Sequence, residues 1–208
     1  MGHPIFAAIY DRALAATERA GLTETRVRII GAGTGRTLEL GAGTGANLDH
    51  YSASVTELVL TEPDPHMARR LEAKLAATPP APPTEVVAAG AEALPFDDGS
   101  FDTVVSTLVL CSVEDLERTT AEIRRVLKPG GNLLLIEHVR DGDNPNRARW
   151  QDRLERPWGW VAAGCHPNRD TRAALAAAGF DVAALEPGEL PKAGPIVRPT
   201  ISGAAISL

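Results

Sequence analysis

The sequence predicts a single α/β domain in which helices cover both faces of a seven-stranded, mostly parallel sheet. From Arg36 onward, short apolar runs alternate with alanine-rich helical stretches, which is the rhythm of a parallel sheet. A glycine-rich turn at 41–45 follows the first apolar run, and two apolar runs near the end are close enough to pair as an antiparallel hairpin. With 208 residues, of which 44% are hydrophobic, the chain can supply the core of one domain.

The predicted elements follow one another in a regular order. Residues 1–35 form a helical lead-in, because apolar side chains recur at spacings of three and four between positions 4 and 20, and Gly21 is a suitable helix end. Residues 36–140 form the core, in which the proline-rich stretch 78–84 is a surface loop. The strands predicted for this core are 37–40, 57–62, 85–90, 102–110 and 132–139, and the helices are one that opens near Ala46 and those at 66–77 and 114–128.

The segment 141–170 differs in composition from the rest of the chain. It holds all three tryptophans and many polar residues, but it has no sustained helical or strand period. We interpret it as an insertion or lid, for which Gly159 and Gly164 are suitable hinges. The last part, 171–208, is predicted to contain a helix at 171–179 and antiparallel strands within 180–185 and 199–208.

Charge and composition argue against several classes of partner. The chain has 27 acidic residues and 21 lysines and arginines, a net charge of −6, which disfavours nucleic acid and an anionic membrane surface. No apolar run reaches the roughly 18–20 residues that a membrane span needs. The first residues also lack the basic region of a secretory signal. We therefore expect a cytoplasmic protein with no stable membrane insertion and a small-molecule ligand.

The two cysteines, Cys111 and Cys165, are too few and too separated in sequence for a disulfide framework or a cysteine-based zinc site. We expect reduced thiols and no bound metal. Cys111 lies in an apolar context and is interpreted as a packing residue. Cys165 is either a redox-sensitive thiol of the lid or a small buried packing residue.

The pentapeptide GAGTG occurs twice, at 31–35 and 41–45, and its surroundings separate the two copies. The first copy runs straight into a strand and is predicted to be a flexible turn. The second follows a strand and precedes a segment that can open a helix, so backbone N–H groups at Gly41, Gly43 and Gly45 would face a ligand together with the helix dipole. Taken alone, the second copy is also compatible with a dinucleotide site.

Two acidic residues narrow the choice of ligand. Glu62 ends the next strand, about 20 residues after the glycines, where a carboxylate accepts hydrogen bonds from ribose hydroxyls. Glu39 directly precedes the glycines, where it would repel a pyrophosphate but attract an ammonium group. The expected ligand is therefore a nucleoside that has two free ribose hydroxyls, carries an amino-acid moiety and lacks phosphate. S-adenosylmethionine has these properties. The alternative is that both glutamates are ordinary solvated residues.

Several longer motifs and residue groups carry a family resemblance: TLELGAGTGANLDHY, LTEPD, AGAEALPFDDGSFDTVV and RRVLKPGGNLLLIEHV, together with Trp150-Gln151, Pro157-Trp158, Gly164-Cys165 and Arg169-Asp170-Thr171 in the lid. The longer motifs resemble those of class I S-adenosylmethionine-dependent methyltransferases, and the resemblance runs from about Ile5 to the C-terminus. The lid residues resemble the microsomal alkyl-thiol methyltransferases called methyltransferase-like seven. The resemblance implies a Rossmann-like sandwich with strand order 3-2-1-4-5-7-6.

The resemblance also implies roles for individual residues. Ala91 and Glu92 would lie against the adenine, and residues 106–108 would close the methionine side of the site. Many members carry an aspartate where this chain has Gly90, which leaves the adenine amino group to Glu92 or a backbone carbonyl. Mammalian members carry an apolar N-terminal membrane segment for which we find no counterpart, so we do not transfer their membrane location. The residues counted as cofactor-binding are Glu39, Gly41, Gly43, Gly45, Asn47, Glu62, Pro63, Ala91, Glu92, Ser106, Thr107 and Leu108.

Candidates for catalysis and for acceptor binding lie elsewhere in the chain. His138 is the candidate general base, because it ends the fifth predicted strand at the edge where open α/β sheets bind ligands. The alternative is a structural histidine hydrogen-bonded to the lid. Tyr10, Trp150 and Trp158 are candidate substrate-binding residues that would cover an apolar acceptor, and the alternative is that the tryptophans fix the lid to the sheet.

The sequence therefore predicts a methyltransferase that uses S-adenosylmethionine, releases S-adenosylhomocysteine and acts on a small apolar acceptor. A thiol is the leading acceptor, because its pKa near ~8.5 leaves it partly ionised without a strong base. The alternatives are O- or C-methylation of a phenol or quinone and N-methylation of a phospholipid headgroup. A cofactor-binding protein without catalysis and an NAD(P)-dependent oxidoreductase are more distant alternatives.

Overall fold

The structure, a computed structural model, describes residues 4–208, with side chains from Tyr10 onward. Its strands are β1 (Gly35–Leu40), β2 (Val55–Thr61), β3 (Thr84–Val87), β4 (Phe101–Thr107), β5 (Leu127–His138), β6 (Phe180–Asp181), β7 (Glu186–Glu189) and β8 (Pro199–Ser207). Its helices are α1 (Pro4–Thr17), α2 (Thr23–Ile30), α3 (Pro65–Ala77), α4 (Leu116–Val126), α5 (Pro145–Val161) and α6 (Thr171–Ala177), with shorter helical turns η1 (Glu18–Leu22), η2 (Leu48–His50) and η3 (Pro195–Val197).

The strands form one sheet in the order β3-β2-β1-β4-β5-β8-β6, and β7 also pairs with β8. Strands β1 to β5 run parallel, whereas β8 is antiparallel to β5, β6 and β7. The predicted order is confirmed, with β8 as the seventh strand of that scheme. β7 is an addition to the prediction, because its four residues, EPGE, are all exposed and show no apolar pattern.

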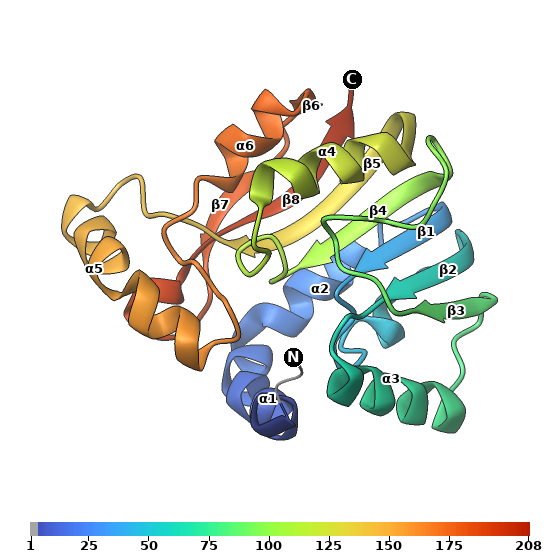
Figure 1. Ribbon diagram of the computed structural model, residues 1–208, viewed down its shortest axis with the longest axis horizontal. Coiled ribbons are helices and arrows are strands. Elements are labelled where there is room, and N and C mark those ends of the chain that lie inside the picture. Colours follow the sequence, from blue (N-terminus) through green and yellow to red (C-terminus); the bar gives the residue numbers. More distant parts are fainter. Residues whose placement is uncertain (1–3) are drawn as a thin grey trace.

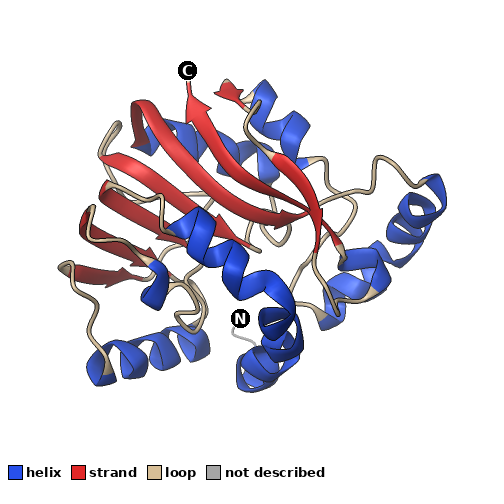
Figure 2. Ribbon diagram, turned by 180° about the vertical axis from the view of Figure 1, so that it is seen from behind, coloured by secondary structure: helices blue, strands red, loops and turns tan. Residues whose placement is uncertain are grey.

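Helices cover both faces of the sheet, as predicted (Figures 1 and 2). α2 lies across one face, where Ile30 belongs to the same apolar cluster as Ile136 of β5. α4 and α6 lie across the other face, where Ile123 and Leu175 belong to the main core. Because both faces are covered, central strands such as β4 are buried on both sides. This explains why the middle of β5, Leu133–Ile136, is a continuous apolar run rather than an alternating one.

The N-terminal helical region extends further than predicted. α1 passes into a single π-helical turn, η1, and α2 then continues to Ile30. Gly21 was expected to end the first helix, and the structure agrees, since its backbone is non-helical and marks a kink between two helices. Its φ of 136° is a conformation that glycine adopts at little cost. α2 was not predicted, because its sequence, TETRVRII, is mostly polar and shows no apolar stripe. Its buried residues are Arg26, Ile29 and Ile30.

The helix predicted to open near Ala46 is a single 3-10 turn, η2. β2 already begins at Val55, so little chain is left for a longer helix. The side chain of Asn47 is also held in buried hydrogen bonds to Glu39 and Thr107. So short a turn has little dipole, and the predicted dipole contribution to ligand binding was therefore wrong.

The segment 141–170 contains a helix that was not predicted, α5, which projects from the body of the molecule (Figure 1). Asn144 caps it by accepting hydrogen bonds from the N–H groups of Asn146 and Arg147, and Pro145 occupies its first turn. Only Ala148 and Gln151 are buried, so its sequence lacks the apolar stripe that identifies most helices. In the described part of the chain no helix, α5 included, is long and apolar enough to cross a membrane.

Candidate functional site

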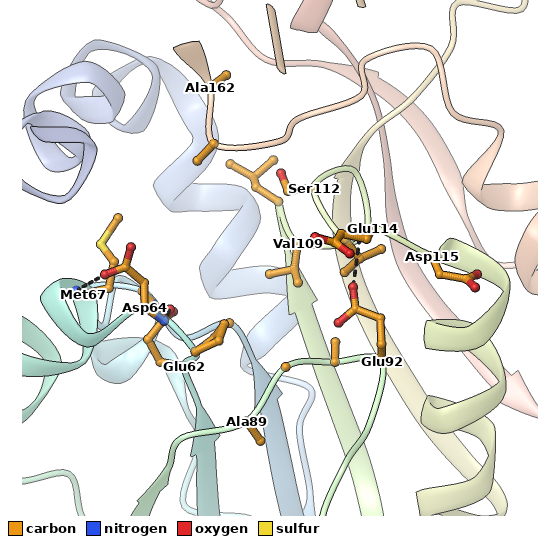
Figure 3. Close-up of a pocket in the computed structure, with 18 of the residues that line it drawn as sticks. Glu62, Asp64, Met67, Ala89, Glu92, Val109, Ser112, Glu114, Asp115 and Ala162 are labelled. Carbon is orange, nitrogen blue, oxygen red and sulfur yellow. Dashed lines mark hydrogen bonds between the residues drawn. The ribbon is translucent and has the colours of Figure 1, made fainter. Parts of the chain in front are cut away.

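A cavity of about 690 Å³ opens at the edge of the sheet where the parallel strands end (Figure 3). Its wall is built from the chain that follows β1, β2, β3 and β4 and from the residues just after α5. Open α/β sheets bind ligands at this edge, and the volume suits a small organic ligand. The predicted site residues that line the cavity are Tyr10, Gly41, Gly43, Glu62, Pro63, Ala91, Glu92 and Leu108.

The glycines of the second GAGTG copy form a tight turn after β1. Gly41, Gly43 and Gly45 all have positive φ, the region that glycine enters most readily. A Cβ atom at Gly41 would lie 2.9 Å from Cγ2 of Val109, across the cavity wall. Gly45 does not line the cavity, and a Cβ there would meet Leu48 at 2.8 Å. Glycine is thus required at Gly41 for the shape of the cavity and at Gly45 for packing.

Glu62 joins the turn after β1 to the start of α3. Its Oε2 accepts a hydrogen bond from the N–H of Gly43 at 2.8 Å, and its Oε1 accepts one from the N–H of Asp64 at 2.8 Å. Burial raises the pKa of Glu62, while these two hydrogen bonds act in the opposite direction. Each carboxylate oxygen has a second lone pair, so the group can still accept hydrogen bonds from a ligand.

Glu92 occupies the opposite side of the cavity from Glu62 (Figure 3). Its Oε1 accepts a hydrogen bond from the N–H of Glu114 at 2.9 Å, which ties the chain after β3 to the start of α4. A Cβ atom at Gly90 would lie 3.2 Å from Oε2 of Glu92. The absence of a side chain at Gly90 therefore leaves room for the Glu92 carboxylate in the cavity wall.

The cavity has an excess of negative charge. Carboxylates flank it on two sides in Figure 3, with Glu62 and Asp64 on one side and Glu92, Glu114 and Asp115 on the other. Among the described lining residues, Arg118 supplies the cationic side chain. Such a wall favours a cationic ligand and disfavours one that carries phosphates.

Glu39, Asn47 and Thr107 are buried in a hydrogen-bond network and do not line the cavity. Asn47 Nδ2 donates to Glu39 Oε1 at 2.8 Å and to Thr107 Oγ1 at 2.9 Å, and the Tyr51 hydroxyl donates to Glu39 Oε2 at 2.5 Å. Burial raises the pKa of Glu39 to about 7. The expectation that Glu39 faces a ligand ammonium group is corrected, because its carboxylate is buried in this network and does not line the cavity.

Arg26 of α2 completes this network and was not predicted. Its Nη1 donates to Asn47 Oδ1 at 2.7 Å and to Thr107 Oγ1 at 3.3 Å, and its Nε pairs with Glu18 at 3.0 Å. The side chain is only 2% exposed. The network therefore connects the N-terminal helices to the ends of β1 and β4. Thr107 lies 81 residues from Arg26 in the sequence, and local sequence patterns do not predict a contact between residues that far apart.

Glu137 is a second buried acid that was not predicted. It is fully buried at the end of β5, and its carboxylate accepts hydrogen bonds from the Ser106 hydroxyl at 2.7 Å and from the N–H groups of Val109 and Cys111 at 3.0 and 3.2 Å. Burial raises the pKa of Glu137, and the hydrogen bonds oppose this shift. Ser106 is likewise buried and does not line the cavity. The pair holds the loop between β4 and α4, which forms part of the wall.

His138 does not line the cavity. It is 9% exposed, and burial lowers its pKa to about 4, while a hydrogen bond to the backbone of Val197 partly opposes this shift. The ring is therefore neutral near pH 7 and contacts η3 rather than a ligand. Its place outside the cavity favours the alternative, a structural histidine, and the role of general base stays a prediction.

The structure places one of the three aromatic candidates in the cavity wall and the other two outside it. Tyr10 lines the cavity, and burial raises its pKa to about 12. Trp150 is 54% exposed on α5, outside the cavity, so the predicted contact with an acceptor is corrected. Trp158 packs against Cys111, Cys165 and Val197, again outside the cavity, which matches the alternative of fixing this segment to the body of the protein.

Comparisons with known proteins agree with this site. Residues 38–135 match a family model described as a methyltransferase domain. The human thiol S-methyltransferase TMT1A is 34% identical over 202 residues, covering 97% of this chain and 82% of that protein. The phosphatidylethanolamine N-methyltransferase of Cereibacter sphaeroides is 31% identical over 155 residues, covering 74% and 75%. A putative methyltransferase solved in complex with the Haloferax volcanii Trm112 activator has the same fold, with a TM-score of 0.71, 19% identity and coverage of 98% and 96%.

Proposed function

We propose that this chain, which belongs to the class I S-adenosylmethionine-dependent methyltransferases and within them to the thiol S-methyltransferase group, methylates the sulfur atom of a small apolar thiol. Membership follows from the identity to TMT1A across most of both sequences. The enzyme class and the cofactor, S-adenosylmethionine, follow from the family. The non-catalytic and NAD(P)-dependent alternatives are thereby set aside, and what is proposed is the acceptor.

The cavity fits the cofactor in charge and in shape. We assign the ribose hydroxyls to Glu62, the adenine to Ala91 and Glu92, and the methionine portion to the turn at Gly41 and Gly43. The carboxylates of the wall favour a ligand with a sulfonium and an ammonium group. When bound, S-adenosylmethionine supplies a methyl group attached to a positively charged sulfur. The protein's part is then to hold an acceptor in line with that methyl group and to exclude water.

An apolar portion of the wall is suited to such an acceptor. Leu108 and Val109 after β4, together with Ala162 and Ala163 after α5, line the cavity alongside Tyr10. These side chains offer few hydrogen bonds, so they favour an alkyl or aryl group over a polar substrate. The segment 141–170 would thus contribute to acceptor binding through two alanines after α5 rather than through the tryptophans of α5.

The absence of a suitably placed histidine among the described lining residues favours a thiol. A thiol with a pKa near ~8.5 is partly ionised at neutral pH, whereas an alcohol or phenol needs a base held against it. His138 is buried elsewhere, and Tyr10 stays protonated at neutral pH. The observation that carries the proposal is this acidic cavity, which has an apolar portion and no histidine among its described lining residues, in a chain similar over 97% of its length to a thiol S-methyltransferase.

A second candidate is N-methylation of a phospholipid headgroup, because the Cereibacter relative is named for that reaction. The acidic wall would attract the headgroup ammonium. A protonated amine, however, has no free lone pair and would need a base before it could react. We therefore rank the amine below the thiol.

The test is a methyl-transfer assay with S-adenosylmethionine and a panel of acceptors at matched concentration. The panel contains alkyl thiols of increasing chain length, phenols and phosphoethanolamine, and methylated products are identified by mass spectrometry. We expect methylation of the thiols, with KM falling as the alkyl chain lengthens. Methylation of phenols or phosphoethanolamine alone, or of no acceptor although S-adenosylhomocysteine binds, would overturn the acceptor assignment.

A further inference from the structure

Cys111 and Cys165, which are 54 positions apart in sequence, pack together in the structure. Cys111 is 1% exposed in the loop between β4 and α4, and Cys165 is 6% exposed in the chain between α5 and α6. Both belong to one small apolar cluster with Val197, against which Trp158 packs. Both thiols are free, and the fold brings together two residues that are distant in the sequence.

The backbone brings the two residues within reach of a disulfide bond. The N–H of His166, the residue after Cys165, donates a hydrogen bond to the carbonyl oxygen of Cys111 at 2.6 Å. Standard bond lengths and angles on each side of this hydrogen bond keep the two Cα atoms no more than about 7.4 Å apart. Disulfides span Cα separations of about 4.4 to 6.8 Å, so only a small adjustment is needed.

The two thiols also differ in reactivity. A hydrogen bond between them is the largest influence on both groups, and it lowers the pKa of Cys165 and raises the pKa of Cys111. The positive charge of Arg169 also favours the Cys165 thiolate. Cys165 is the more exposed of the two and lies next to Gly164, whose φ is 86°. It is thus the better nucleophile and the one that a reagent reaches first.

We propose that Cys111 and Cys165 form a reversible oxidation site, in which a low-molecular-weight disulfide converts the two thiols into an intramolecular disulfide. The Cys165 thiolate attacks one sulfur of the reagent and releases one thiol, leaving a mixed disulfide. The Cys111 thiolate then attacks Cys165 Sγ and releases the second thiol. Two cysteine thiols are oxidised, one external disulfide is reduced to two thiols, and two protons pass from the protein to the products.

The bond would fix one wall of the cavity to another. Ser112 and Val113 next to Cys111 line the cavity, as do Ala162 and Ala163 just before Cys165. The two segments are already linked, because the Arg169 guanidinium donates hydrogen bonds to the carbonyls of Leu110 and Val113 at 2.6 and 2.5 Å. Hydrogen bonds open and reform, whereas a disulfide does not open without a reductant. Oxidation is therefore expected to slow entry and exit of the cofactor.

The first test uses the wild-type protein and needs no substitution. The protein is incubated under native conditions with bis(2-hydroxyethyl) disulfide, which is small and uncharged, and is then analysed by intact mass and by non-reducing peptide mapping. We expect the loss of two hydrogen atoms and a peptide that joins Cys111 to Cys165, both reversed by dithiothreitol. An unchanged mass, or stable mixed disulfides on both cysteines, would overturn the proposal.

The second test measures the rate at which bound radiolabelled S-adenosylhomocysteine exchanges. Oxidised wild-type protein is expected to exchange it roughly tenfold more slowly than reduced protein. Cys111→Ser, which should stop at a mixed disulfide on Cys165, and Cys165→Ser, which lacks the first nucleophile, are the matched controls, and neither should form the cross-link. Equal exchange rates in cross-linked and reduced wild-type protein would refute control of access to the cavity. Neither test depends on which acceptor is methylated, so failure here and failure of the thiol assignment are distinguishable.

Discussion

Glu62 is the residue on which the proposed cofactor site most depends. It lines the cavity, and its carboxylate accepts hydrogen bonds from the backbone N–H groups of Gly43 and Asp64. Glu62→Gln retains the size of the side chain but loses one acceptor and the negative charge. Hydrogen bonds to charged groups contribute about 1.5 to 3 kcal/mol, so the Kd for S-adenosylhomocysteine should rise roughly 10- to 100-fold. Isothermal titration calorimetry measures this directly.

Glu57, which lies on β2 five residues before Glu62, provides the matched control. It is partly exposed and pairs with Arg36 at 3.0 Å, away from the cavity. Glu57→Gln should leave the Kd unchanged. If both variants bind as tightly as the wild type, Glu62 does not hold the ribose.

His138 offers a pH-dependent test of its structural role. The ring titrates near 6.5 in the unfolded chain and at about 4 in the folded protein, so only the unfolded state gains a proton between these values. The stability associated with the neutral ring is fully present above pH 6.5 and is lost as the pH falls towards 4, by about 3 kcal/mol.

His138→Gln removes this titration. Between pH 6.5 and 4, its free energy of unfolding, measured with urea, should fall less than that of the wild type. Its kcat at pH 7 should be within about twofold of the wild-type value, as expected of a residue outside the site. A loss of kcat of a hundredfold or more in a folded variant would restore His138 as the general base.

Some site residues could be predicted from the sequence and others could not. Glu62 and Glu92 lie in the cavity wall as expected, because the end of a parallel strand places them at the ligand-binding edge. Glu39 has the same kind of position, but whether its carboxylate faces a ligand depends on Asn47 and Tyr51, whose side chains fold back towards it. Such contacts depend on the tertiary fold and leave no periodic signal.

At the scale of elements, the loop between β4 and α4 depends on Glu137. Its carboxylate accepts hydrogen bonds from two backbone N–H groups of that loop, and Glu137→Gln would turn an amide donor towards one of them. We expect the KM for S-adenosylmethionine to rise roughly tenfold while the protein stays folded. Hydrogen exchange at residues 109–111 should also become faster, and unaltered exchange there would contradict a positioning role.

The end of α5 and its exposed face have different predicted roles. Ala162→Phe places a large ring in the cavity wall and should raise the KM for long-chain thiols roughly tenfold or more, because the acceptor loses space. Trp150→Ala removes a larger side chain from the same segment but outside the cavity, and should leave that KM within about twofold. The opposite ranking in steady-state kinetics would restore Trp150 as an acceptor contact.

Elements with a strong apolar pattern were predicted, and elements without one were not. α3 and α4 have clear apolar faces and lie where expected, with Asp64 and Asp115 as their N-caps. α5 buries too little surface to show a pattern, and β7, whose side chains are all exposed, pairs with β8 through its backbone. An element that is held by backbone hydrogen bonds, or that projects into solvent, needs no regular spacing of apolar side chains. Its sequence therefore gives little sign of its secondary structure.

At the scale of the whole molecule, the alternation of strands and helices predicted the sheet, and the sheet determines where the cavity lies. Parallel strands β1 to β4 end on the same edge, so the turn after β1, Glu62 after β2 and Glu92 after β3 converge there although they are distant in sequence. The chemistry proposed for that edge combines an acidic wall for a sulfonium cofactor with an apolar portion for the acceptor.

The most direct test offers the enzyme a single acceptor molecule in which either a sulfur or an oxygen atom can be methylated. 4-Mercaptophenol carries a thiol and a hydroxyl on one apolar ring, so binding is shared and only the reacting atom differs. With S-adenosylmethionine and the purified protein, we predict that the S-methyl product dominates, as identified by chromatography and mass spectrometry against synthetic standards. A product methylated mainly on oxygen would contradict the account, because a phenol needs a stronger base held against it than a thiol does, and the described cavity wall offers carboxylates but no histidine.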